Sequence, residues 1–204
     1  MKETLELNDE RLISVENFKN ISREEIKPII ELPLGVSVKA QMVLVLLNEK
    51  PGLEFNVSAD SEVLKLLKKF EEIGLVSAVF PSDTDKGKVK IVVSRKKEII
   101  DELNNLSPSN GSDHKRYGQL MGFPDTAIEA FLDPDKRLNF KDQEKIREGL
   151  PHFFRFRMSR EHAAEELEVI KRWNKLILEY APELFDELYP PDEASKFKKL
   201  IEKM

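Results

Sequence analysis

The sequence predicts an α+β fold, with a small N-terminal α/β unit that contains a three-stranded sheet and a mainly helical C-terminal region. Three observations support this prediction. Apolar and polar residues alternate in short stretches of the first half, as in half-buried strands. In the second half, apolar residues recur with helical spacing instead. Between the halves lies NNLSPSNGSDH (104–114), whose Pro, Gly, Ser and Asn are typical of a loop.

This loop sets the expected domain organisation. Residues 1–36 form an N-terminal lead, 37–106 the small α/β unit, 107–115 a linker or loop, and 116–204 the helical region.

Prolines and glycines mark where the N-terminal elements end. Ser22 and Glu25 have the spacing of a capping box, but Pro28 and Pro33 restrict the lead to short turns. Gly74 is a suitable end for the helix before it. In order, the α/β unit is expected to contain a helix over 38–48, a strand over 53–57, a helix over 61–73, strands over 75–80 and 88–94, and a helix over 96–103.

The second strand of the hairpin is expected to be half-buried. Val89, Ile91 and Val93 share one of its faces, whereas Lys88 and Lys90 take the other. We therefore predict a sheet that helices cover on one side.

A winged-helix DNA-binding domain is the alternative for this half, with 61–73 as recognition helix and the hairpin as wing. Only two helices are expected before the hairpin, whereas that fold needs three. The candidate recognition helix also carries equal numbers of lysines and glutamates, namely Lys65, Lys68, Lys69, Glu62, Glu71 and Glu72. Phosphate contact requires an excess of positive charge, so the α/β sheet is preferred.

The C-terminal region is expected to be almost entirely helical. Ser159 is placed to cap its longest helix, in which apolar residues from Ala163 to Tyr180 keep helical spacing. Pro182 and Pro190 separate the last helices. The expected helices lie near 114–121, 124–132, 141–148, 160–180, 182–188 and 192–203.

Composition restricts the possible functions. The chain has no cysteine, which excludes disulfides, thiolate nucleophiles and thiolate metal sites. Its net charge of −5 is not that of a general nucleic-acid binder. Charged residues make up 35% in runs of mixed sign, typical of thermophilic proteins and also of many mesophilic helical ones. With a charged N-terminus and no long apolar run, we expect a cytoplasmic location without membrane contact.

The stretch from Tyr117 to Leu132 predicts a sharp corner between two helices. Gly122 is placed to end the first helix in a left-handed conformation, and Pro124 to begin the second at its first position. The alternative to a ligand site is a packed corner, at which Asp125 already satisfies the helix dipole. The candidate ligand-binding residues are Tyr117, Gly118, Gly122, Phe123, Pro124, Asp125 and Thr126, joined by His152 or His162.

The sequence GQLMGFP, which ends at Pro124, gives the pattern G-x-L-[LM]-G-[FY]-P, and the helix after it ends in A-F. This pattern resembles the signature of an uncharacterised, mostly archaeal family of domains of unknown function. In relatives with a fuller signature, a cysteine pair follows the proline, where this chain has Asp125, Thr126 and Ala127. The resemblance covers residues 114–180 and implies no activity. Any metal or redox chemistry of those cysteines would be lost here.

Residues 136–160 are basic in an otherwise acidic chain, because eight lysines and arginines against three acidic residues leave +5. Within this segment Phe154 and Phe156 alternate with Arg155 and Arg157. Aromatic rings between arginines are typical of a surface for single-stranded nucleic acid. The alternative is an extended segment that buries its phenylalanines and exposes its arginines.

No catalytic or metal motif stands out. His162 and Glu166 lie one helical turn apart with His152 upstream, but the pairing H-E-x-x-H is missing, and we predict neither metal nor cofactor. The phosphate-binding and nucleophile motifs G-x-x-x-x-G-K-[ST], G-x-G-x-x-G and G-x-S-x-G are missing as well. The sequence therefore does not decide whether the chain is an enzyme.

Three functions remain open at this stage. The first is a non-enzymatic module that binds another protein or a second copy of itself. The second is an orphan enzyme or small-ligand binder with a pocket at the Gly122–Pro124 corner. The third is single-stranded nucleic-acid binding through residues 136–160. We rank them in this order.

Overall fold

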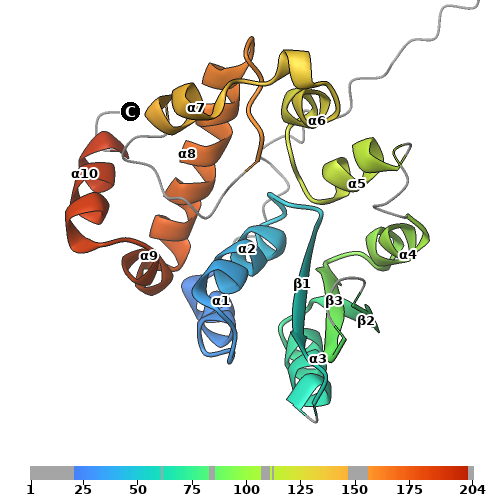
Figure 1. The fold of residues 1–204 in the computed structure, drawn as a ribbon. Helices are drawn as coiled ribbons and strands as arrows, with labels where there is room; N and C mark the ends of the chain where they lie inside the picture. The colour runs from blue at the N-terminus through green and yellow to red at the C-terminus, as the bar shows by residue number, and fades with distance from the viewer. Residues whose placement is uncertain are drawn as a thin grey trace, which may run out of the picture.

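The computed structural model describes residues 21–60, 62–82, 86–106, 111, 113–146 and 156–201. In this part of the chain it contains ten α-helices and one three-stranded antiparallel sheet, which confirms the predicted α+β class (Figure 1). Among the same residues, no helix combines the length and the apolarity that a membrane span requires.

A short helix, α1 (Arg23–Ile30), lies where the sequence predicts only turns. The expected capping box is present, since Ser22 Oγ accepts from the Glu25 N–H and the Glu25 carboxylate accepts from the Ser22 N–H. Pro28 lies inside the helix with its ring exposed. The prediction of turns was wrong because one proline removes one backbone hydrogen bond, whereas the cap and the full burial of Ile26 and Ile29 stabilise the helix.

The second helix, α2 (Val36–Leu46), joins the two halves of the chain. Its residues Ala40 and Met42 to Leu46 are buried. It contacts α1, α8 and α9 on one side and strands β1 and β3 on the other. This placement explains why the second half of the helix, from Met42 to Leu46, is apolar on every side.

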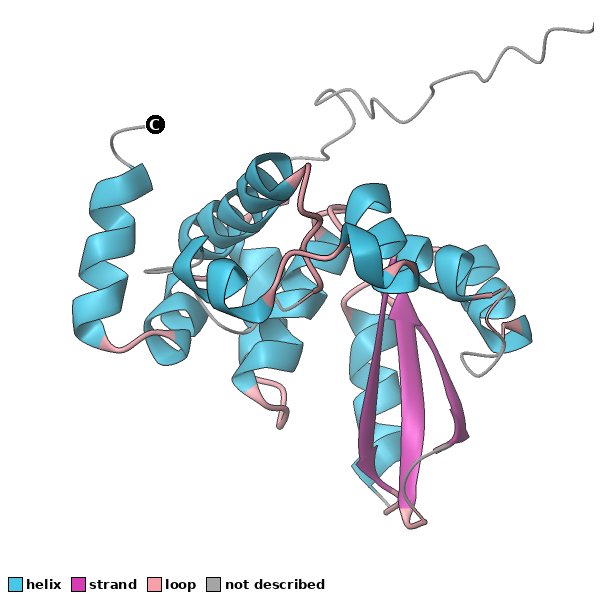
Figure 2. Ribbon diagram, turned by 45° about the horizontal axis from the view of Figure 1, so that its top comes forward, coloured by secondary structure: helices cyan, strands magenta, loops and turns pink. Residues whose placement is uncertain are grey.

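The sheet lies at one end of the molecule, where its three strands run side by side (Figure 2). It consists of β1 (Gly52–Ser58), β2 (Val76–Pro81) and β3 (Lys88–Ser94) in the order β1-β3-β2, and all pairs are antiparallel. In the register, Ile91 of the central strand lies between Phe55 and Val79. The strands and α3 (Glu62–Glu72) confirm the expected elements of this unit.

Helices cover both faces of the sheet, so the prediction of cover on one side was wrong. Ile91 and Val93 face the large core cluster with α2 and α3. Val92, on the opposite face, packs with Ile100 and Leu103 of α4 (Lys97–Asn105). This is the face of Lys88 and Lys90, which the sequence predicts to be exposed. The amphipathic helix α4 follows β3 almost directly and folds back over it.

Three helices, α1, α2 and α3, precede the hairpin, so the sequence-based count of two was wrong. The winged-helix alternative still lacks its helix-turn-helix, because β1 leads into α3 through residues 59–61 alone. In α3 the ammonium of Lys65 pairs with Glu62 at 2.7 Å, which reduces the positive charge available for a phosphate.

The C-terminal helices form close to the expected ranges. Ser159 does not cap the long helix, because that helix begins only after His162 and the Ser159 hydroxyl instead accepts from the N–H groups of Glu161 and His162 at 3.2 and 3.3 Å. The helices are α5 (His114–Leu120), α6 (Asp125–Leu132), α7 (Phe140–Ile146), α8 (Ala163–Tyr180), α9 (Pro182–Leu188) and α10 (Pro191–Ile201).

One large hydrophobic core connects the α/β unit with the C-terminal helices. It contains Phe70 of α3 and Ile91 of β3 together with Trp173, Phe185 and Phe197 of the last helices. Most of the expected linker, residues 107–115, lies outside the described part of the chain.

Candidate functional site

The predicted elbow is present between α5 and α6. Gly122 has a φ of +77°, and its N–H donates to the Gln119 carbonyl at 3.0 Å, while the Phe123 N–H donates to the Gly118 carbonyl at 3.0 Å. This pair of bonds is a Schellman motif, which ends α5. Pro124 occupies the N-cap of α6 and not the predicted first helical position, because its ψ of 140° is extended. The chain therefore turns sharply within a few residues.

The two helices approach each other closely at Gly118. A Cβ atom there would lie 2.8 Å from Cγ1 of Ile128 on α6, which is closer than a real Cβ contact. The absence of a side chain at this position thus lets α5 and α6 pack against each other beside the elbow.

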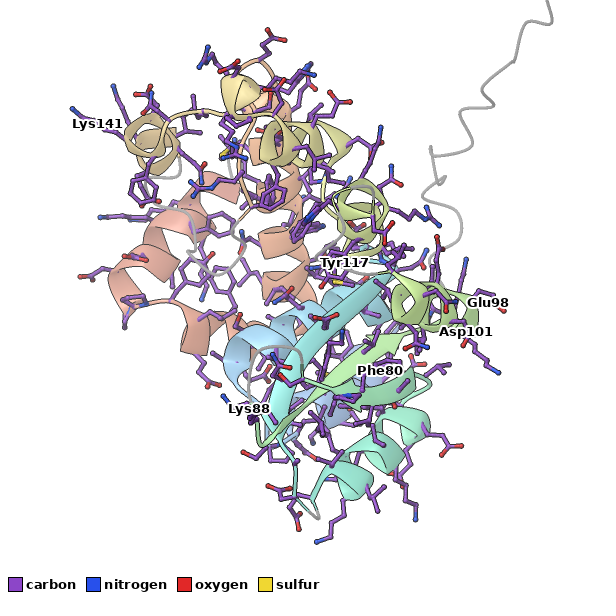
Figure 3. The ribbon with its side chains drawn as sticks, turned by 45° about the vertical axis from the view of Figure 1, so that its right-hand side comes forward. Phe80, Lys88, Glu98, Asp101, Tyr117 and Lys141 are labelled. Atoms are coloured by element: carbon purple, nitrogen blue, oxygen red, sulfur yellow. The ribbon has the colours of Figure 1, made fainter. Side chains whose placement is uncertain are left out.

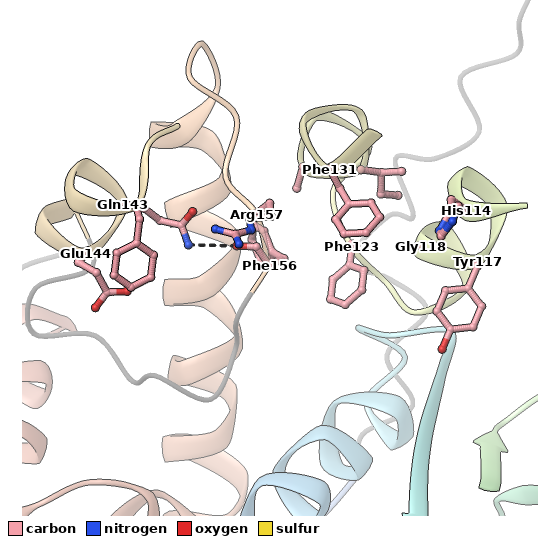
Figure 4. Close-up of a pocket in the computed structure, with 12 residues that line it drawn as sticks. His114, Tyr117, Gly118, Phe123, Phe131, Gln143, Glu144, Phe156 and Arg157 are labelled. Carbon is pink, nitrogen blue, oxygen red and sulfur yellow. Dashed lines mark hydrogen bonds between the residues drawn. The ribbon is translucent and has the colours of Figure 1, made fainter. Parts of the chain in front are cut away.

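A pocket of about 560 Å³ opens beside this elbow. Its walls come from α5, α6 and α7 and from the extended segment 156–158, segments that are distant in sequence (Figure 4). Most of the lining is aromatic or aliphatic. The lining residues are His114, Tyr117, Gly118, Phe123, Ala127, Ile128, Phe131, Phe140, Gln143, Glu144, Phe156 and Arg157.

The pocket joins residues of two sites that were predicted separately from the sequence. Tyr117, Gly118 and Phe123 belong to the predicted corner site. Phe156 and Arg157 belong to the predicted nucleic-acid segment. The rings of Phe123 and Phe156 are neighbours, with centroids 6.0 Å apart. A contact between these distant segments brings them together.

Other predicted residues lie outside the pocket lining. Gly122 and Pro124 shape the elbow without lining the pocket, and the Asp125 carboxylate accepts from the Gln119 amide at 2.9 Å. The Thr126 hydroxyl donates to the Glu166 carboxylate at 2.6 Å.

The histidine that lines the pocket is not one of the two that were predicted. The His162 ring lies 3.2 Å from the Glu165 carboxylate at the start of α8 and does not line the pocket. His152, Phe154 and Arg155 lie outside the described residues. His114, which sequence reasoning missed, lines the pocket and contacts the Phe131 ring at 5.7 Å.

The opposite wall was also missed. It comes from α7, whose Phe140, Gln143 and Glu144 line the pocket (Figure 4). The only signal in the sequence is an apolar residue at the start of a charged helix, which is too weak to mark a site. At the far side of α7, Lys141 extends away from the protein (Figure 3).

Gln143 attaches the extended segment to α7. This buried side chain donates to the Phe156 carbonyl at 3.4 Å and accepts from the Met158 N–H at 3.3 Å. Side chains alternate along an extended segment, so Phe156 and Met158 point into the core while Arg157 points outward. The alternation that the sequence shows is therefore that of a half-buried segment.

The basic segment does not present a stacking surface in its described part. Phe156 is buried against Phe123 and Trp173. The Arg137 guanidinium donates to the Ala130 carbonyl at 2.8 Å and to the Phe131 carbonyl, so it ends α6. Lys136 pairs with Glu129 at 3.1 Å, so two of the six described basic side chains of this segment are used within the protein.

A buried lysine lies behind the aromatic wall. The ammonium of Lys50 lies 5.5 Å from the ring centroid of Phe123 and 5.4 Å from that of Trp173. It donates to the Gln41 side-chain carbonyl at 2.8 Å. Burial lowers the pKa of Lys50 from 10.5 to about 8, because the charged form loses its hydration. Cation–π contacts offset part of this loss.

His162 and Glu166 do not converge on a common ligand position, since Glu166 faces Thr126 and the Ser159 N–H. Across the described residues, no group of three or more histidine, aspartate or glutamate side chains is arranged to hold a metal ion.

Comparison of the chain with models of known protein families, with curated proteins and with solved structures found no match. The resemblance to the archaeal family therefore stays a prediction.

Proposed function

We propose that this protein binds a small, mainly apolar molecule in the pocket between α5, α6, α7 and segment 156–158. The observation that carries the proposal is the pocket itself, in which five aromatic rings surround a space of about 560 Å³. Pockets that bind small molecules usually measure about 300–1,000 Å³ and combine apolar walls with a few polar groups. The lining has this composition, and its polar side chains are those of His114, Tyr117, Gln143, Glu144 and Arg157.

Two of the aromatic walls support the proposal most directly. Phe131 and Phe140 are 50% and 63% exposed although each lines the pocket. Exposed aromatic rings are unfavourable in water, and a bound molecule would cover their faces. Binding would therefore bury apolar area that the folded chain leaves open.

The test is ligand binding to variants of these rings. We would screen small aromatic molecules by isothermal titration calorimetry against the wild type, Phe140→Ala and Phe131→Ala. Loss of one ring should weaken binding by about tenfold, since the covered area contributes on the order of 1–2 kcal/mol. Leu64→Ala is the matched control, because Leu64 is 75% exposed on α3 and does not line the pocket. Equal loss in the control variant, or no binding to the wild type, would contradict the proposal.

Protein binding is the second candidate, because α6 and α7 carry further exposed apolar residues beside Phe131 and Phe140, namely Leu132 and Ile146. A second copy of the chain could cover this surface. Light scattering over a range of concentrations tests self-association. If the wild type is a monomer at every concentration and Leu132→Asp has the same mass, self-association through this surface is refuted.

A further inference from the structure

Arg157 is the cationic side chain of the pocket, and its position is set by the segment that carries it. Phe156 and Met158 on either side are buried, and Gln143 bonds to the backbone of both. The Arg157 side chain is exposed and lines the pocket. Among the described residues it makes no hydrogen bond or ion pair. The backbone of Arg157 is therefore held in place, and all N–H donors of its guanidinium remain available to a ligand.

We infer that the ligand is an aromatic monocarboxylate, whose ring lies among the aromatic walls and whose carboxylate pairs with Arg157. This inference rests on the proposed binding function and specifies its ligand. A guanidinium presents a planar set of N–H donors that matches the two oxygens of a carboxylate. No other lysine or arginine belongs to the described lining.

The geometry of the walls favours a planar ring over a flexible alkyl chain. The rings of Phe123 and Phe156 meet at an angle of 51°, and those of His114 and Phe131 at 49°. Tilted rings offer both faces and edges, and aromatic pairs prefer offset or edge-to-face contacts. A flexible chain would also lose more conformational entropy on binding than a rigid ring.

The second charged group of the lining favours a single negative charge. Glu144 lies on the α7 wall, and within the described part of the chain its carboxylate forms no ion pair with Arg157. A phosphate monoester carries nearly two negative charges at neutral pH, and its repulsion by Glu144 would exceed that of a carboxylate. One arginine also matches one carboxylate in charge.

A matched pair of probes tests the inference, namely 2-naphthoate and the neutral 2-naphthalenemethanol. Both present the same ring system, and they differ in charge. We would measure the affinity of each by isothermal titration calorimetry at pH 7 for the wild type, Arg157→Gln and Arg160→Gln. Arg160 is the control, because it is an exposed arginine three residues away that does not line the pocket.

The wild type should bind naphthoate about tenfold more tightly than the alcohol, as expected for a charge-assisted hydrogen bond. Arg157→Gln should lower the affinity for naphthoate about tenfold, to that for the alcohol, and continued binding of the alcohol would show that the aromatic walls are intact. Arg160→Gln should keep the preference.

The outcomes separate the two proposals. If both probes bind the wild type equally well, the carboxylate inference is wrong while the binding function stands, whatever the variants do. If the preference survives in Arg157→Gln, the assignment to Arg157 is wrong. If neither probe binds at millimolar concentration, the binding function itself fails.

Discussion

The ammonium of Lys50 lies 5.5 Å from the centroid of the Phe123 ring, and the same ring forms a wall of the pocket. Lys50 is 3% exposed. A cation from the N-terminal unit thus supports an aromatic wall of the C-terminal region. Interactions of this kind strengthen when the cation is removed from water.

The burial of Lys50 predicts that stability rises with pH. Its folded-state pKa of about 8 lies below the usual 10.5, so between these values the unfolded chain binds more protons. The free energy of unfolding should therefore increase by about 2 kcal/mol from pH 7 to 9.5, as the cost of burying the charged ammonium is relieved. In Lys50→Met this contribution should vanish. Urea denaturation of both proteins, followed by the fluorescence of the single tryptophan, Trp173, measures it. Equal pH dependence in both would refute the prediction.

Substitution of Gly122 should destabilise the protein more than that of Gly74. Both have a positive φ, of 77° and 78°, which costs a non-glycine residue about 1 kcal/mol. Around Gly74 an added Cβ meets nothing, whereas at Gly122 it would lie 3.2 Å from Lys50 Cγ and from Pro51 Cδ. We expect Gly74→Ala to cost about 1 kcal/mol and Gly122→Ala about 2–3 kcal/mol. Thermal unfolding of the two variants measures both costs. Similar costs would show that the close approach to Lys50 and Pro51 is unimportant.

Gly118 and Ile128 should be energetically coupled. A Cβ at Gly118 would lie 2.8 Å from Cγ1 of Ile128, so Gly118→Ala should cost about 1–3 kcal/mol by overpacking. Ile128→Ala alone should cost about 2–4 kcal/mol by leaving a cavity. In the double variant the new methyl group fits into that space, and the total should be smaller than the sum by about 1 kcal/mol or more. Simple additivity in urea denaturation would argue against this close approach.

Glu166 should be essential to the packing of α6 on α8. The residue is 1% exposed, and its carboxylate accepts from the Thr126 hydroxyl at 2.6 Å and from the Ser159 N–H at 2.9 Å. Glu166→Ala leaves the buried Ser159 N–H and the half-buried Thr126 hydroxyl without this acceptor and should cost about 2–4 kcal/mol. The exposed neighbour on the same helix, Glu165→Ala, should change the unfolding free energy by less than about 0.5 kcal/mol. A similar small change for Glu166→Ala would contradict the assigned hydrogen bonds.

Local sequence patterns were sufficient for most helices, for the hairpin and for the elbow. Alternation placed β1 and β3, and Gly122 predicted the left-handed end of α5 because a positive φ is a local property. Local rules failed where packing outweighed them. Pro28 lies within a helix because Ile26 and Ile29 are buried against the core.

The pocket, in contrast, is a product of the tertiary structure. Gln143 and Phe156 bring α7 and an extended segment against the elbow, and no spacing along the chain encodes such a contact. The same packing decides the roles of similar residues, since Phe156 forms a wall while its neighbour Arg157 keeps its charge available. Burial depends on which distant segments meet, and for that reason only the folded arrangement shows which of the candidate residues share a site.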